Sequence, residues 1–270
     1  MKDINKLQKI FVSNNQPFIV SLKRGAFTES NHQVHAVVCD NKGRILMSAG
    51  NPYYDTFIRS SLKPFQALPF VSSGTAEQIK VGTKGIAIAC ASHKGSTEHA
   101  REAFKLLWNS DIDVNKLKCP QPTTKKSKLE HNCSGKHAAF LATCKKLHWP
   151  LENYLEKNHP LQKEILRRVS ELLNVASEEQ IIEKDDCGSP TIFLQIKHMA
   201  SLYAQLTAST DPELEQINRA MVQNPRLIAG ESMFDTELMI RSHGQIISKG
   251  GSEGVQCIGR NGEGLGIAIK

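Results

Sequence analysis

Strand patterns lie at both ends of this chain, and helical patterns fill its middle. The segment "VHAVVCDNKGRILMSAG", residues 34–50, has β-branched runs on either side of a turn signal at residues 40–43, which predicts a hairpin. Residues 237–270 return to a strand pattern that is broken by Gly-rich turns. This order predicts an α+β or α-β-α layered fold in which the first and last strands meet in one sheet.

The middle of the chain supplies helices and two further strand patterns. Helices are predicted where apolar residues recur at helical spacing: after Arg59, over residues 96–108, from Cys133 onward, and over residues 160–175 and 191–207. The apolar segment "KGIAIACASH", residues 84–93, is typical of a buried strand, and residues 181–190 of a strand followed by a Gly/Pro turn. A chain of 270 residues can form one large domain or two small ones, with a sizeable core.

The charge distribution, the apolar segments and the cysteine spacing indicate the partners and the cellular compartment of the protein. The formal net charge is +7, but the basic residues are dispersed, and the densest run, residues 125–128, is typical of a solvated loop, so no nucleic-acid partner is expected. Residues 1–18 have no signal-peptide core, and no apolar run reaches the ~18–20 residues of a membrane span. Seven irregularly spaced Cys do not indicate a disulfide framework. Together these features predict a cytoplasmic protein with reduced thiols and no membrane partner.

Three groups of residues could carry chemistry, and the first is Ser60 with Lys63. On a helix, residues three apart share one face, so the Lys amine could take the proton of the Ser hydroxyl if burial keeps that amine neutral. The alternative is a purely structural role, in which Ser60 caps the start of the helix. The pattern alone favours capping.

The second group is "CASHKG", residues 90–95, together with Lys249. Ser92 and His93 would project from the end of the predicted strand, and Lys249 is followed by two glycines that allow a ligand close to the backbone. A Ser-x-x-Lys early in the chain and a Lys-x-Gly late in it are similar to the elements of penicillin-binding proteins and β-lactamases, although a Ser-x-Asn motif is missing. The alternative is a polar turn without a catalytic role.

The third group is the segment 131–137, with residues 185–188 about fifty positions later. It contains Cys133 and Cys187, and two thiols with nearby His and carboxylate groups could bind Zn²⁺. Their spacing matches no common zinc motif, so spacing alone favours buried structural cysteines.

Taken together, these segments resemble a known family, the class 3, rhizobial-type L-asparaginases (the asparaginase II domain family). The resemblance begins at Ser21 and covers essentially the whole chain, in family order. The matching stretches are "LKRGAFTES" (22–30), "IRSSLKPFQALP" (58–69), "CASHKGSTEH" (90–99), "HNCSGKHAAFL" (131–141), "DDCGSP" (185–190), "AMVQNPRLIAG" (220–230), "KGGSEGVQC" (249–257) and "GLGIAIK" (264–270).

The resemblance implies a fold like that of serine β-lactamases and glutaminases, a sheet flanked by helices in a protein that is usually a homodimer. It implies a single asparaginase II-type domain over residues 1–270 that lacks the closing turn and helix of its relatives. Either the sequence is a fragment, or a natural truncation leaves the strand at residues 264–270 as an exposed sheet edge. The implied activity is hydrolysis of L-asparagine to L-aspartate and ammonia, a step of asparagine catabolism.

The resemblance also implies a role for each site residue. Ser60 pairs with Lys63, and Ser92 pairs with Lys249. The metal ligands are Cys133, Lys136 and Cys187, which with water hold one zinc ion near the substrate. Arg59 and His137 help to hold the substrate, and Asp185 orients the zinc-bound water. Asp186 stands where the family usually has Gly.

A mechanism follows from these residue types. The sequence leaves open which serine attacks the side-chain amide carbon. We favour Ser60, deprotonated by Lys63 on the same helix, while Ser92 with Lys249 relays protons. Backbone N–H groups near Ser60 or after Lys249 are candidates for the oxyanion site. Two alternatives stay open: a Ser–Lys amidohydrolase of the same fold that acts on glutamine or another amide, and a truncated metal-binding protein with little activity.

Overall fold

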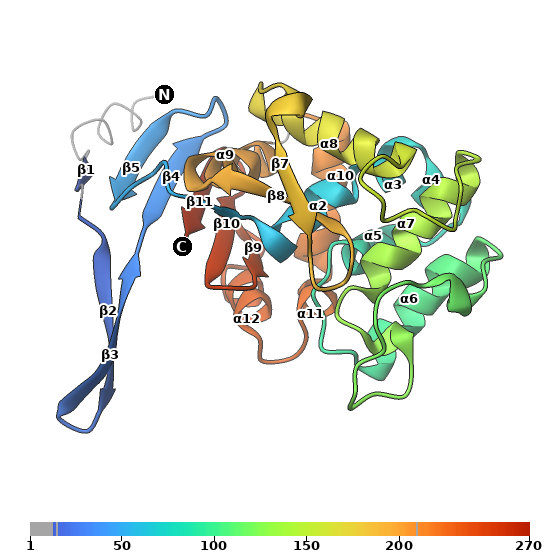
Figure 1. The fold of residues 1–270 in the computed structure, drawn as a ribbon, viewed down its shortest axis with the longest axis horizontal. Helices are drawn as coiled ribbons and strands as arrows, with labels where there is room; N and C mark the ends of the chain where they lie inside the picture. The colour runs from blue at the N-terminus through green and yellow to red at the C-terminus, as the bar shows by residue number, and fades with distance from the viewer. Residues whose placement is uncertain (1–12, 15, 209) are drawn as a thin grey trace.

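The computed structural model describes residues 13–14, 16–208 and 210–270 (Figure 1). Most of the segment in which a signal peptide was sought, residues 1–12, lies outside the described residues. In the described part of the chain, no helix has both the length and the apolar character needed to cross a membrane.

A six-stranded sheet brings together strands from both ends of the described chain. Across the sheet its strands are β1 (Ser13–Asn14), β5 (Ile45–Ala49), β4 (Ala36–Asp40), β11 (Leu265–Ile269), β10 (Val255–Arg260) and β9 (Ile246–Gly251). The antiparallel pairing of β4 with β11 confirms that early and late strands meet, and the β4–β5 pair confirms the hairpin. The predicted exposed edge at residues 264–270 is wrong, because β11 is hydrogen-bonded to β4 on one side and to β10 on the other.

Helix α9 (Ile196–Thr207) packs closely on this sheet, against β4, β10 and β11. Gly266 permits the close approach, because a Cβ atom there would lie 1.9 Å from the Ala200 carbonyl oxygen. Gly259 lies under the same helix, with the Thr207 side chain 2.6 Å from the place of a Cβ. These two glycines therefore belong to helix–sheet packing rather than to turns.

The remaining strands of the described chain form two smaller sheets. One contains β6 (Asp55–Phe57), β8 (Pro190–Gln195) and β7 (Ile181–Lys184) in that order. The other is the hairpin of β2 (Phe18–Arg24) and β3 (Phe27–Val34), which projects from the rest of the molecule (Figure 1).

The other helices form a second region beside the sheet (Figure 1). The α-helices there are α2 (Lys63–Gln66), α3 (Leu68–Ser72), α4 (Thr75–Gln78), α5 (Gly82–Ala89), α6 (Thr97–Asn109), α7 (Ser134–Lys146), α8 (Pro160–Leu173), α10 (Pro212–Gln223) and α11 (Pro225–Ile228). Helix α12 (Phe234–Arg241) packs against strand β9 of the sheet. The short 3₁₀ helices are η1 (Arg59–Leu62), η2 (Val114–Lys116), η3 (Lys128–Glu130) and η4 (Ser177–Glu179). Helices α6, α7 and α8 confirm the helices predicted there.

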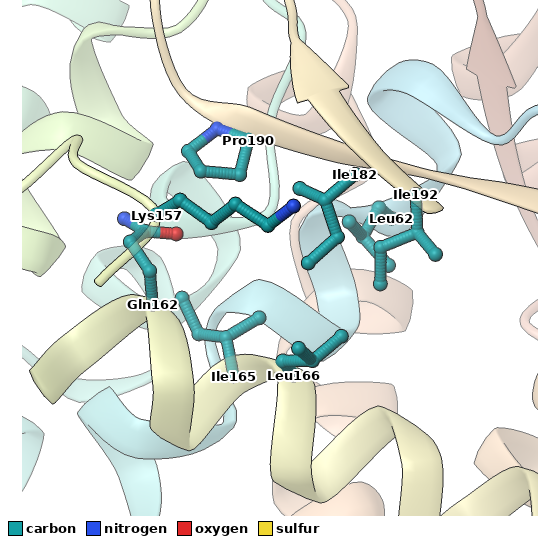
Figure 2. A pocket seen from close by; sticks show the side chains of 8 residues that line it. All are labelled: Leu62, Lys157, Gln162, Ile165, Leu166, Ile182, Pro190 and Ile192. Atoms are coloured by element: carbon teal, nitrogen blue, oxygen red, sulfur yellow. The ribbon is translucent and has the colours of Figure 1, made fainter. Parts of the chain in front are cut away.

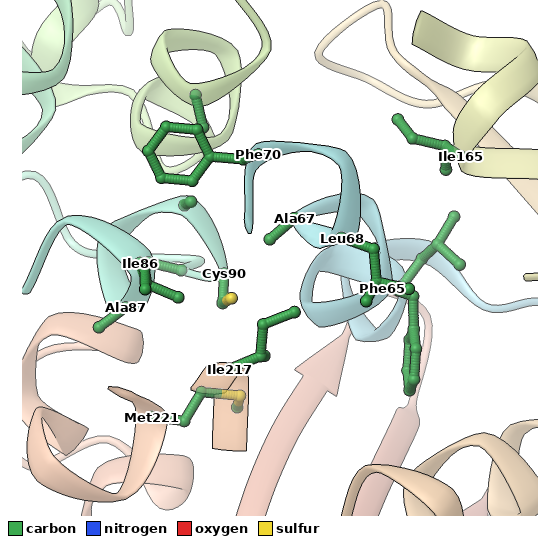
Figure 3. Close-up of a cluster of buried hydrophobic side chains, with 14 of the residues drawn as sticks. Phe65, Ala67, Leu68, Phe70, Ile86, Ala87, Cys90, Ile165, Ile217 and Met221 are labelled. Carbon is green, nitrogen blue, oxygen red and sulfur yellow. The ribbon is translucent and has the colours of Figure 1, made fainter. Parts of the chain in front are cut away.

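A buried apolar cluster lies where α2, α3, α5 and α10 meet (Figure 3). Phe65 of α2, Phe70 of α3, Ile86 of α5 and Met221 of α10 all belong to this cluster, and each is at most 2% exposed. The polar residues Ser60, Ser61 and Lys63, at the start of this region, therefore lie next to a closely packed apolar core. The chain is a mixed α/β protein with several sheets, as predicted at that level.

Three sequence predictions of secondary structure are wrong. Residues 82–89 form helix α5 rather than a strand, because a short buried apolar run has no periodicity that separates the two, and alanine favours a helix. Residues 190–195 form strand β8 before the α9 helix begins. Residues 237–241, the beginning of the predicted strand pattern, belong to helix α12 rather than to a strand. The predicted helix after Arg59 exists only as the short pieces η1, α2 and α3.

Candidate active site

The amine of Lys63 is buried and surrounded by oxygen atoms. Its Nζ lies 2.7 Å from the Ala91 carbonyl oxygen, 2.8 Å from Ser92 Oγ and 3.4 Å from the Asn132 carbonyl oxygen. Carbonyl oxygens can only accept, so Ser92 is the one partner of these three that can give a proton to the amine. A neutral amine here can donate its two hydrogens to the carbonyls and accept the Ser92 O–H.

A rigid loop after α5 presents Ser92. The Ser92 N–H donates to the Ile228 carbonyl oxygen at 2.8 Å. Burial lowers the pKa of the neighbouring His93 well below its usual value, so the ring is neutral. His93 Nδ1 accepts from Gly95 N–H at 3.1 Å, and Nε2 then donates to Ser134 Oγ at 3.0 Å. His93 therefore holds the loop and does not contact the Ser92 hydroxyl.

Ser60 has neither of its two predicted contacts. The residue that caps η1 is Ile58, so Ser60 is not the helix cap that its pattern favoured. In the part of the chain that is described, no hydrogen bond reaches Ser60 Oγ, and none joins Ser92 to Lys249. Lys63 instead reaches across to Ser92, 29 residues later in the chain.

Lys249 lies on β9 and is buried, 1% exposed. Its Nζ donates to the Gly250 carbonyl oxygen at 2.6 Å. Asp235 of α12 fixes this strand, since its carboxylate accepts from Gly250 N–H at 2.8 Å, Ser248 Oγ at 2.7 Å and Gln256 Nε2 at 2.9 Å. The Gly250 N–H is thus occupied and is not free for an oxyanion.

The two buried lysines influence each other. Burial lowers the pKa of Lys249 to about 8, the Asp235 carboxylate opposes this, and the nearby Lys63 charge lowers it further. Two like charges in one buried cluster disfavour double protonation. The Lys63 charge therefore favours the neutral form of Lys249.

Replacing Lys249 by Met should stabilise the protein near neutral pH. Folded Lys249 loses its proton near pH 8, whereas the unfolded residue keeps it to its usual value of 10.5, so the free energy of unfolding rises with pH across this window. Below the window the buried ammonium costs about 3 kcal/mol, which Lys249→Met removes. Denaturant unfolding at several pH values measures this difference, with the surface variant Lys116→Met as control. An equal pH slope in the wild type and Lys249→Met would contradict it.

Two cysteines and a lysine meet at the start of α7. Lys136 Nζ lies 3.3 Å from Cys187 Sγ. Hydrogen bonding from the Cys133 thiol, then the Lys136 charge, hold the pKa of Cys187 far below its usual range. Burial lowers the pKa of Lys136, but the two sulfurs outweigh it and raise the pKa. Without a metal ion, the group is an ammonium beside a thiolate.

His137 and Tyr154 support this cluster from one side. Tyr154 Oη accepts from the Lys118 N–H at 2.9 Å, so its own hydrogen goes to His137 Nδ1, 2.8 Å away. Burial lowers the pKa of His137 to about 4, so the ring is neutral and its hydrogen is on Nε2. The ring interacts with the Cys187 sulfur, while Nε2 is buried without an aligned hydrogen bond.

These residues fit a zinc ion chemically. Two thiol sulfurs and one amine nitrogen converge, and sulfur and nitrogen are the donors that Zn²⁺ prefers. The described residues contain no group of three or more His, Cys, Asp and Glu side chains arranged for a metal, so the Lys136 amine is needed as the third ligand. That amine would have to release its proton on binding.

Arg59 and two carboxylates lie beside the cluster. Arg59 adopts φ 52°, a left-handed conformation that is strained for a residue with a side chain. Its Nε lies 2.8 Å from Asp185 Oδ1, without the alignment of a hydrogen bond, and its Nη2 donates to Asp186 Oδ2 at 2.5 Å. The Asp185 side chain is 10% exposed and that of Asp186 is 87% exposed.

The predicted site residues therefore converge, although not in the predicted pairs. Charges connect the groups, since Lys63 acts on both Lys249 and Cys133. Sequence reasoning missed Tyr154, Asp235 and the Asn132 carbonyl. Asp235 looks like an ordinary acid in a first helical turn, and nothing near Tyr154 signals its role.

A small crevice lies among η1, α8, β7 and β8 (Figure 2). Its volume is about 20 Å³, enough for a single water molecule. It is lined by Leu62, Lys157, Gln162, Ile165, Leu166, Ile182, Pro190 and Ile192. It contains none of the predicted site residues and is too small for an amino acid.

The buried Lys63–Ser92 contact brings together a hydroxyl and an amine, the groups that serine–lysine nucleophilic catalysis requires. Comparison with protein families shows which family the chain belongs to. The profile of the L-asparaginase II family matches residues 20–270, and the chain belongs to that family.

Solved structures show where the fold recurs. The crystal structure of Mglu in its native form is 11% identical, with a TM-score of 0.50, over 98% of this chain and 64% of the Mglu chain. Mglu in its tris and glutamate form is also 11% identical, with a TM-score of 0.49, over 98% of this chain and 59% of that chain. At this identity the first likeness shows the fold alone. This chain spans less than two thirds of Mglu, and no curated protein gives a significant match.

Proposed function

We propose that this chain is an L-asparaginase that hydrolyses L-asparagine to L-aspartate and ammonia, with Ser92 as nucleophile and Lys63 as its base. The observation that carries the proposal is the 2.8 Å contact between Lys63 Nζ and Ser92 Oγ. Membership of the L-asparaginase II family supports the amide substrate. The same contact supports Ser92 over Ser60, since a general base must lie within hydrogen-bond reach of the proton it takes.

The reaction proceeds in two halves. In the first, neutral Lys63 takes the Ser92 proton while Oγ attacks the side-chain amide carbon of asparagine. The carbon–nitrogen bond breaks, Lys63 returns the proton to the leaving nitrogen, and ammonia departs from an aspartyl ester on Ser92. In the second half, water attacks the ester and Lys63 takes its proton. The proton returns to Ser92 Oγ, and L-aspartate is released.

Another residue of the site binds the substrate. Arg59 receives the α-carboxylate of the substrate, because its side chain is 17% exposed whereas Lys63, Lys136 and Lys249 are 1–2% exposed. Lys249 lies in the same buried cluster, where the Lys63 charge helps to lower the pKa of Lys249.

We also propose one zinc ion per chain, held by Cys133, Lys136 and Cys187. When bound, the ion supplies a positive charge that orients the substrate. His137 and Asp185 lie beside these ligands and position the substrate. The dimeric state and the cytoplasmic location stay predictions.

The test of the proposed activity is ammonia release from L-asparagine, L-glutamine and a chromogenic β-lactam. We expect kcat/KM for asparagine to exceed that for glutamine by at least about 10-fold, the usual discrimination of one methylene group. A value for glutamine that equals or exceeds it would favour an amidohydrolase acting on glutamine. No product from any substrate, with zinc still bound, would favour a metal-binding protein without activity.

A further inference from the structure

The Arg59 guanidinium is already paired with carboxylates in the free protein. Asp185 is the inner of the two and is fixed in a turn: its N–H donates to the Ser189 carbonyl oxygen at 2.9 Å, and its carbonyl oxygen accepts from Gly188 N–H at 2.8 Å. Asp185 Oδ1 also accepts from Asp186 N–H at 2.8 Å. Asp185 is therefore held by the backbone around it.

Asp186 is held differently. Its side chain is 87% exposed, and the hydrogen bond from Arg59 Nη2 at 2.5 Å is the side-chain contact found for it among the described residues. An exposed ion pair is weak and costs little to break, because water replaces the lost contact on both partners. The Asp186 carboxylate can thus leave Arg59 without disturbing any packing.

We infer that Asp186 is an internal competitor that occupies the place of the substrate α-carboxylate on Arg59 and lowers the affinity for the substrate. The inference rests on the proposed function, in which Arg59 receives that carboxylate. A substrate carboxylate and the Asp186 carboxylate carry the same charge and the same acceptor atoms, and both need Nη2. Substrate binds only to the fraction of molecules in which Asp186 has moved away, so its apparent affinity falls by that fraction.

The experiment is steady-state kinetics of L-asparagine hydrolysis by Asp186→Asn. The amide keeps the shape of the side chain but removes the charge that competes for Arg59. We expect KM to fall about two- to five-fold, the range for loss of an exposed ion pair, with kcat unchanged within about two-fold. Thermal unfolding verifies that the variant is folded.

Asp111→Asn is the matched control. Asp111 is also a fully exposed carboxylate paired with a cation, Lys145 Nζ at 3.0 Å, and the substitution makes the same charge change away from the site. We expect its KM to equal that of the wild type. A KM for Asp186→Asn that is unchanged or higher in an active enzyme overturns this inference alone. A wild-type chain that releases no ammonia from asparagine overturns the proposed function and this inference with it.

Discussion

Replacing Ser92 by Ala is expected to reduce kcat for L-asparagine by at least about 10³-fold, because the attacking oxygen is lost. Lys63→Met should cost a similar factor, since nucleophile and base act as a unit and the loss of either disables both. The measurement is ammonia release under substrate saturation. Lys63 Nζ and Ser92 Oγ are 2.8 Å apart, so each variant breaks the same contact.

Ser60→Ala is the matched control for this prediction. It removes an equal hydroxyl in the same region, from a residue whose Oγ lacks a hydrogen bond in the described structure. We expect its kcat to stay within about 10-fold of the wild type, in the range of an indirect effect. An inactive Ser60→Ala with an active Ser92→Ala would reverse the roles of the two serines.

The second large effect is expected at the thiol–amine cluster, where Cys187→Ser should weaken zinc binding at least about 100-fold, since changes to outer-shell partners already cost 10–100-fold. The thiolate of Cys187 is stabilised by the hydrogen bond from Cys133 and by the Lys136 charge, whereas a serine hydroxyl stays protonated and binds zinc poorly. Elemental analysis of the purified protein and a competition titration with a chelator measure the effect.

Cys144→Ser separates this effect from a general loss of buried thiols. Cys144 is a buried free thiol on α7, the helix that carries Lys136, and it belongs to the apolar core. It should retain zinc as the wild type does. If purified wild-type protein takes up no zinc, or if both variants lose it equally, the proposed metal site does not exist.

The sequence predicted the coarse fold where its patterns were long. The β4–β5 hairpin and helices α6, α7 and α8 have clear turn signals or extended periodicity, and the structure confirms them. Strand β8 and helix α5 were assigned wrongly because both are short apolar runs, for which the surrounding packing decides the conformation.

Several residues that the sequence singled out lie close together in the structure, but not in the predicted pairs. Ser60 and Lys63 were paired because they are close in the sequence. The structure shows that Lys63 lies under the loop after α5, and that loop follows a helix the sequence pattern did not indicate. A contact between residues 63 and 92 depends on how two helices pack, which no local pattern encodes. Tyr154 and Asp235 act by orienting other residues, and such roles leave no local signal.

The central claim is that Ser92 is the nucleophile of an asparagine-hydrolysing enzyme. Covalent labelling is its most direct test. A diazo-ketone analogue of L-asparagine alkylates the hydroxyl that attacks the amide carbon, and peptide mass spectrometry then locates the label. We expect the label on Ser92 of the wild type, and we expect added L-asparagine to reduce the labelling. The Lys63→Met variant should carry no label. A label on Ser60, or one that asparagine does not prevent, would contradict the claim.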